Sequence, residues 1–146
     1  MKLYTSKMLD ISIEDMQGQP FIKEVWSGVL TEKIFKRLIY DSIEVYEKYL
    51  PNILNRQETL LMYANVSGIT MIRNEEIEWL EKEINPIYER LGFTHQAVVM
   101  PSSFFASQAV LNYEGVSESG KFITNVFKDE LSAIRWYFKK INKALQ

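Results

Sequence analysis

Short apolar runs alternate with longer amphipathic stretches in this chain, and this alternation is the strongest constraint on its fold. Four stretches have apolar side chains at helical spacing: 31–50, 74–91, 102–113 and 129–141. Three short apolar runs between them are typical of buried strands: 59–66, 97–101 and 121–127. Strands that alternate with helices in this way form a largely parallel sheet covered by helices.

The first thirty residues add a different pattern. Leu9, Ile11 and Ile13 alternate with polar residues, which is typical of a half-buried strand. A turn sequence at 17–20 precedes a second apolar stretch at 21–30, so we expect an antiparallel hairpin. The complete prediction is one α/β domain over 1–146. Its mixed, mainly parallel five-stranded sheet is covered by about four helices, in the order β-β-α-β-α-β-α-β-α.

Particular residues mark where the helices should begin and end. Three residues can cap helix starts with side-chain oxygens: Thr31, Asn74 and Asp129. Pro51 is expected to end the first helix. Pro86 should kink or split the second helix, because it has no N–H to donate to the carbonyl of Lys82. Gly92 should end that helix.

Composition excludes several kinds of chemistry. The chain has no Cys and one His, so it cannot form a disulfide, a thiolate metal site or a site with two imidazoles. A formal net charge of −2 argues against nucleic acid as a partner. The N-terminus lacks the apolar run of a signal peptide, and no stretch approaches the roughly 20 apolar residues of a membrane-spanning helix. We therefore expect a cytoplasmic protein without a transmembrane segment.

The sequence indicates no catalytic residue, cofactor or metal ligand. His95 lies at the start of an expected strand, away from the carboxyl edge where sites in parallel sheets gather, so a structural role is favoured. Negative charge is favourable beside the positive end of a helix dipole, so the acidic cluster near the start of the second expected helix indicates a solvated helix start and not a metal site. The cluster consists of Glu75, Glu76, Glu78, Glu81 and Glu83. The chain also lacks the glycine-rich motifs that bind nucleotide phosphates.

The most informative segment for binding is apolar. Phe104 and Phe105 are adjacent at a helix start, so their side chains point about 100° apart and cannot face the same part of a core. Either one packs on the sheet and the other on a neighbouring helix, or one forms an apolar lip with Met100 and Val110 beside the carboxyl ends of the central strands. The candidate ligand- or partner-binding residues are Asn65, Ser67, Gly68, Met100, Ser102, Ser103, Phe104 and Phe105.

The order of segments resembles that of the STAS domain, and more closely that of the stand-alone SpoIIAA-like proteins. The pieces that carry the resemblance are 25–28, 78–80, Gly92 with 96–101, 127–130 and 133–137. The stretch 65–72 is similar to the Asp-Leu-Ser-Gly-Val stretch of the anti-sigma-factor antagonists. Residues 73–76 depart from the Asp-Ser-Ser-Gly loop that follows it in those proteins, so the phosphorylated serine is missing. SpoIIAA-like proteins have also been compared with CRAL-TRIO lipid-binding domains.

Three functions stay open from the sequence. The resemblance implies a non-enzymatic binding or regulatory module for a small apolar ligand, a membrane surface or a partner protein. The second function is an enzyme that uses only carboxylates or hydroxyls, and it requires Glu75, Glu78 and His95 or similar groups to converge. The third is a self-associating structural protein, for which a homodimer is the simplest form.

Overall fold

We describe the fold from a computed structural model, which covers residues 1–54, 58–69, 73–101, 115–117 and 120–145. Within these ranges the chain forms one seven-stranded sheet with the strand order β1-β2-β3-β4-β5-β7-β6. The strands are β1 (Lys2–Thr5), β2 (Leu9–Met16), β3 (Gln19–Gly28), β4 (Leu61–Ile69), β5 (His95–Val99), β6 (Gly115–Val116) and β7 (Ile123–Phe127). Strands β3, β4, β5 and β7 are parallel, whereas β1, β2 and β6 pair antiparallel with their neighbours.

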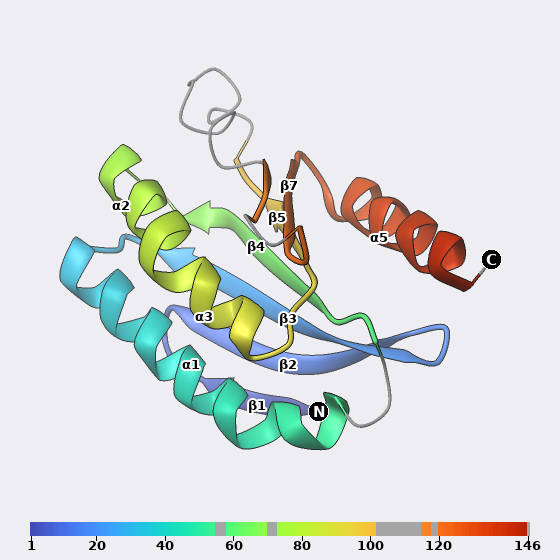
Figure 1. Cartoon of the computed structure of the whole chain (residues 1–146). Helices are drawn as coiled ribbons and strands as arrows, with labels where there is room; N and C mark the ends of the chain where they lie inside the picture. The colour runs from blue at the N-terminus through green and yellow to red at the C-terminus, as the bar shows by residue number, and fades with distance from the viewer. Residues whose placement is uncertain (55–57, 70–72, 102–114, 118–119, 146) are drawn as a thin grey trace.

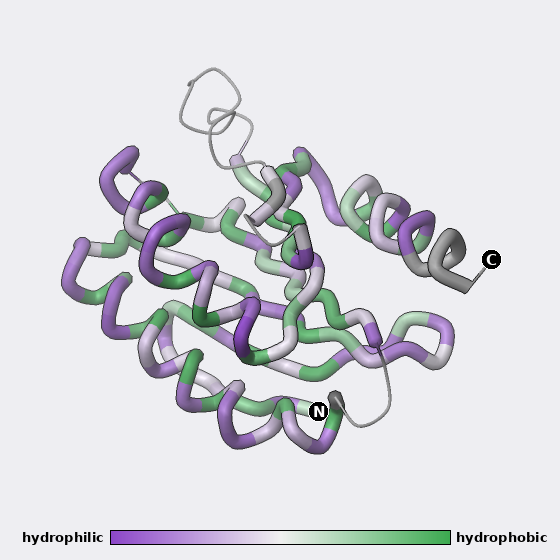
Figure 2. The backbone as a smooth tube through the Cα atoms, in the orientation of Figure 1, coloured by the Kyte–Doolittle hydropathy of each residue, from purple (hydrophilic) through white to green (hydrophobic). Residues whose placement is uncertain are grey.

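Helices cover both faces of this sheet (Figure 1). One face carries α1 (Glu32–Leu54) and a helical stretch made of α2 (Asn74–Trp79), the π-helical η1 (Leu80–Ile84) and α3 (Asn85–Arg90). The other face carries α5 (Glu130–Leu145). The backbone coloured by hydropathy has its apolar residues concentrated on the strands, with hydrophilic residues recurring along the helices (Figure 2). The fold therefore has three layers, and each helical layer encloses its own core.

Alternation along each strand divides the side chains between the two cores. In β4, Met62 and Val66 belong to the core beneath α1 and α3, whereas Leu61 and Tyr63 belong to the core beneath α5. β4 lies between two parallel neighbours and is buried on both faces, which confirms the central parallel position expected for this run. The core beneath α1 and α3 is the larger of the two.

Several expected turns and caps are confirmed. Gln17 and Gly18 both have positive φ and connect β2 to β3 as a two-residue hairpin loop. The Thr31 hydroxyl accepts a hydrogen bond from the amide of Ile34 at 3.2 Å, so Thr31 caps α1. The Asp129 carboxylate accepts one from the amide of Ser132 at 2.8 Å and caps α5 in the same way.

The helical stretch at 74–90 also follows the expected pattern in most respects. A π-helical turn precedes Pro86, so the helix is interrupted where the proline has no N–H for the carbonyl of Lys82. Gly92 has φ 106°, and the chain leaves the helix there. The cap differs from expectation: Arg73, not Asn74, is the N-cap. The side chain of Glu76 accepts a hydrogen bond from the amide of Arg73 at 3.3 Å.

Two expectations about the fold are wrong, and one concerns residues outside the described ranges. The described residues form seven strands, not five, because β1 and the two-residue β6 extend the sheet at its edges. β1 has only four residues and little apolar alternation, so its strand structure depends on pairing with β2. The described residues form three of the expected helical stretches, and the fourth, expected at 102–113, lies outside them. Pro51 does not end α1: it lies inside its final turn, where it removes one hydrogen bond and the helix continues to Leu54.

No helix in the described part of the chain is long and apolar enough to span a membrane.

Candidate functional site

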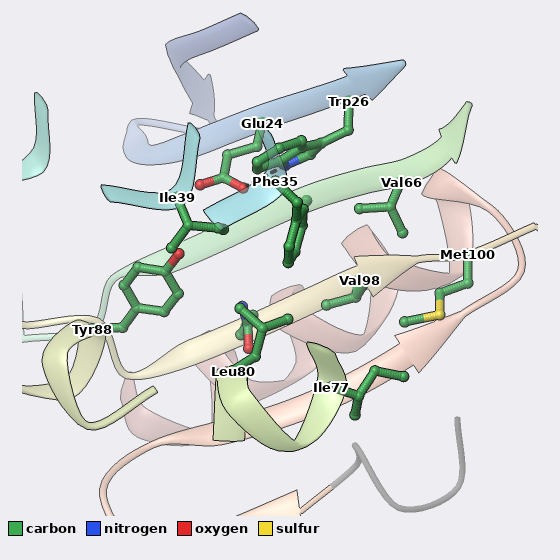
Figure 3. Close-up of a pocket in the computed structure, with 12 residues that line it drawn as sticks. Glu24, Trp26, Phe35, Ile39, Val66, Ile77, Leu80, Tyr88, Val98 and Met100 are labelled. Carbon is green, nitrogen blue, oxygen red and sulfur yellow. Dashed lines mark hydrogen bonds between the residues drawn. The ribbon is translucent and has the colours of Figure 1, made fainter. Parts of the chain in front are cut away.

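A cavity of about 40 Å³ lies between the sheet and the helices α1, α2, η1 and α3 (Figure 3). Its walls come from β3, β4 and β5, the residue after β5, and the helical layer. The lining residues are Glu24, Trp26, Phe35, Ile39, Ala64, Val66, Ile77, Leu80, Tyr88, Gln96, Val98 and Met100. Eight of them are apolar side chains without a hydrogen-bonding group, so most of the surface offers only van der Waals contact.

Strand register explains why the cavity lies where it does. Glu24 pairs with Ala64 across β3 and β4, and Ala64 pairs with Val98 across β4 and β5. These three residues form one row across the sheet on the face beneath the helices. Ala64 has the smallest side chain in the row, so it leaves space between its two neighbours.

Glu24 is the charged residue of the cavity wall, and its side chain is only 2% exposed. Trp26 lies two residues further along β3, on the same face, and its indole Nε1 donates a hydrogen bond to Glu24 Oε1 at 2.9 Å. The hydroxyl of Tyr46 on α1 donates to Glu24 Oε2. Burial raises the pKa of Glu24, and the hydrogen bonds from Tyr46 and Trp26 oppose that rise.

Further aromatic rings pack against the two donors of Glu24, Trp26 and Tyr46. The rings of Trp26 and Phe35 have centroids 5.4 Å apart. The ring of Tyr46 packs edge-on against Tyr88 at 6.2 Å and against Phe93 at 5.2 Å. These contacts join β3 to α1 and α1 to α3, and they hold the two donors of Glu24, Trp26 and Tyr46, in place.

Polar and apolar groups occupy different parts of the cavity. Glu24 and the hydroxyl of Tyr88 lie toward one end in Figure 3, whereas Val66, Ile77 and Met100 lie toward the other. Gln96 adds a second polar side chain to the lining. Its Oε1 accepts a hydrogen bond from the Thr124 hydroxyl at 3.1 Å, and its Nε2 lies 3.6 Å from the Met62 sulfur.

Among the described residues, the structure places only one of those expected at the site, Met100, in the wall of the cavity. Met100 is buried and lines the cavity. Asn65 follows Leu61 and Tyr63 on the face of β4 that α5 covers, and its Oδ1 accepts hydrogen bonds from the amide and hydroxyl of Ser67. Gly68 is packed closely against β3, where an added Cβ would lie 2.9 Å from the carbonyl oxygen of Trp26. Ser102, Ser103, Phe104 and Phe105 lie outside the described residues.

His95 lies on the opposite face of the sheet from the cavity. Its ring packs edge-on against Trp136 at 5.6 Å and Tyr137 at 5.4 Å, and its Nδ1 is 2.8 Å from the Thr94 hydroxyl. Burial, together with the positive charge of Lys140, lowers the pKa of His95 to about 4. The imidazole is therefore neutral near pH 7.

The glutamates of the second helix do not converge with His95. Glu75 and Glu78 lie on α2, which covers the other face of the sheet, and both are exposed. Glu76 is buried and takes part in the cap at Arg73. Across the part of the chain that the structure describes, no three His, Cys, Asp or Glu residues are arranged to hold a metal ion.

Sequence reasoning missed Glu24, which is the main polar residue of the site. The available signal is alternation: Ile22, Glu24 and Trp26 share one face of β3, and two of these three are strongly apolar. A carboxylate that interrupts an apolar face of a strand is a candidate for a buried functional group. Trp26 belongs to the core beneath α1 and α3 and also donates a hydrogen bond to Glu24.

Comparison with known proteins identifies the fold. No family model matches the chain, and no curated protein matches it. A solved structure of an uncharacterized DUF3478-family protein from Shewanella loihica PV-4, described as having a SpoIIAA-like fold, is similar with a TM-score of 0.52 and 15% sequence identity. The match covers 91% of this chain and 98% of that one. The chain therefore has a SpoIIAA-like α/β fold, as the resemblance in its sequence implied.

Proposed function

We propose that this chain is a non-enzymatic binding module, and that it holds a small ligand with a largely apolar body between its sheet and the layer formed by α1, α2, η1 and α3. The observation that carries the proposal is the cavity beside Ala64, whose wall is mostly apolar and includes the buried Glu24 and Gln96. Small-molecule sites commonly combine an apolar lining with a few polar groups that orient the ligand.

The composition of the cavity wall supports binding over catalysis. Its residues include one carboxyl group and no Lys, Arg, His, Ser or Thr, so the phenol of Tyr88 is the one other titratable group beside Glu24 in the wall. The groups that the enzyme alternative required, Glu75, Glu78 and His95, lie on opposite sides of the sheet. A reaction that depends on two convergent groups therefore has little support here.

The size of the cavity restricts the ligand. A volume of about 40 Å³ has room for about three water molecules. A ligand of about three non-hydrogen atoms fits this space without moving the helices or the sheet. A longer group, such as a four-carbon chain, requires α2, η1 and α3 to move outward, and the π-helical turn in this stretch is a feature often found at functional sites.

A titration with 1-butanol tests the proposal. We expect saturable changes in the methyl NMR signals of Val66, Leu80 and Val98, because these side chains line the cavity. Ala64→Val should weaken binding, since its two additional methyl groups enter the cavity. Ala97→Val is the matched control, because Ala97 lies on the neighbouring strand but faces the core beneath α5. An absence of saturable shifts at the cavity methyls, or equal binding by the Ala64→Val variant, contradicts the proposal.

A further inference from the structure

We propose that the cavity selects ligands that carry a positively charged nitrogen, and that the carboxylate of Glu24 receives this nitrogen. This inference rests on the proposed function and names its ligand class: a small alkylammonium ion with a short apolar tail.

The first support is the uncompensated acid group. Glu24 is 2% exposed, and its partners, Trp26 Nε1 and the Tyr46 hydroxyl, are both neutral donors. The cavity wall contains no Lys, Arg or His, and none of the ion pairs found among the described residues includes Glu24. Each carboxylate oxygen can accept more than one hydrogen bond, so both can receive a further donor from the cavity.

The second support is energetic. A buried carboxylate without a cation is costly, because its charge has lost most of its hydration. An ammonium group that enters the cavity compensates this charge and supplies N–H donors. An alcohol of the same length supplies a donor but no charge, and a carboxylate ligand adds a second negative charge.

The third support is the placement of the rings and the apolar wall. Trp26, Phe35 and Tyr88 line the cavity, and the electron-rich faces of such rings attract cations. Val66, Ile77 and Met100 lie away from Glu24 in Figure 3 and offer a surface for an alkyl tail. A cation at the Glu24 end and a tail at the Met100 end therefore match the two parts of the cavity.

A purely structural role for Glu24 is the competing explanation. In that case Glu24 links β3 to α1 through the Tyr46 hydroxyl and has no preference for any ligand. The two explanations predict different ligand selectivity. A cation-binding Glu24 favours an amine over an alcohol of the same length, whereas a purely structural Glu24 does not.

The experiment compares n-butylammonium, 1-butanol and butyrate, which have the same chain length, by methyl NMR titration. We expect n-butylammonium to bind at least about tenfold more tightly than 1-butanol near pH 8, and butyrate to bind most weakly. Equal affinity for the amine and the alcohol overturns this inference and leaves the proposed function intact. Failure of all three to bind overturns both.

Two variants separate the role of Glu24 from general charge effects. Glu24→Gln should remove the preference for the amine while 1-butanol binding persists. Glu44→Gln removes the same charge from the exposed side of α1 and should leave the preference unchanged. A preference that persists in a folded Glu24→Gln protein overturns the inference.

A pH series on the unmodified protein provides a test that does not depend on the folding of a variant. The preference for the amine should increase as the pH rises through the pKa of Glu24, because only the ionised carboxyl attracts the cation. The other titratable groups in contact with this site are the phenols of Tyr46 and Tyr88, on α1 and α3. Burial and the nearby Glu24 raise the pKa of Tyr46 well above its usual value, so it stays neutral in this range. A preference that does not vary between about pH 4 and 9 overturns the inference.

Discussion

The two faces of the sheet bury ionisable side chains in different surroundings. Beneath α5, His95 is packed between the rings of Trp136 and Tyr137. Beneath α1 and α3, Glu24 is hydrogen-bonded to Trp26 and Tyr46, but a cavity lies beside it. Both groups have pKa values shifted toward the neutral form by burial. A pKa shifted toward the neutral form therefore does not by itself indicate a binding site. Glu24 differs from His95 because a cavity lies beside it.

The largest expected effect compares one tryptophan from each face. Trp26→Ala should lower the free energy of unfolding by about 3–5 kcal/mol, because it removes a fully packed ring and one donor to Glu24. Trp136→Ala should cost less than half as much, since this side chain is only partly buried. Urea denaturation of both variants measures the difference. Equal losses would show that the two aromatic groups contribute alike.

The next effect concerns His95 and pH. Its pKa is about 4 in the folded protein and 6.5 when unperturbed, so the unfolded chain binds a proton more readily than the folded one. The contribution of His95 to the free energy of unfolding is therefore fully present above about pH 6.5. It decreases by about 3 kcal/mol as the pH falls toward 4. His95→Gln should remove this decline in a comparison of unfolding free energies across the range. Parallel curves for the two proteins would contradict the assignment.

Glu24 contributes to the pH dependence with the opposite sign. Its pKa is raised on folding, so its contribution is complete below the unfolded value near 4.5 and decreases as the pH rises toward the folded pKa. In Glu24→Gln the decline toward low pH caused by His95 should therefore appear steeper than in the unmodified protein. Unfolding free energies measured at the same pH values test this, and an unchanged slope would mean that Glu24 titrates alike in both states.

Tyr46→Phe should have a smaller effect on stability. It removes one of the two donors to a buried carboxyl group, which costs about 1–3 kcal/mol. The variant should also have a still higher pKa at Glu24, because the hydrogen bond from Tyr46 holds that pKa down in the unmodified protein. Tyr40→Phe on the same helix is the control and should be nearly neutral, since Tyr40 is 52% exposed. If the two variants unfold with the same midpoint, the bond to Glu24 contributes nothing.

The smallest effect comes from the two alanines on neighbouring central strands. Ala97→Val enlarges a side chain in the packed core beneath α5 and should cost about 1–3 kcal/mol. Ala64→Val adds the same two methyl groups beside the cavity, so its cost should be near zero. Thermal unfolding of the pair gives the difference directly, and equal destabilisation would indicate that no usable space exists beside Ala64.

Periodicity was sufficient to predict the order of most strands and helices, because each central strand is a short apolar run and each described helix has one apolar face. It was insufficient for β1, whose strand structure depends on pairing with β2. The cavity could not be predicted either, because it depends on register that aligns Glu24, Ala64 and Val98 across three strands. Met100 was expected to form an apolar lip with Phe104 or Phe105, and the structure places it in the wall of the cavity.

The central claim is that the space beside Ala64 holds a ligand. A crystal structure of the protein soaked in 1-butanol tests this most directly. We predict density for the alcohol between Ala64, Val66 and Val98, and no such density in Ala64→Val crystals treated in the same way. Density only at other sites, with the space beside Ala64 empty or holding only water, would contradict the claim.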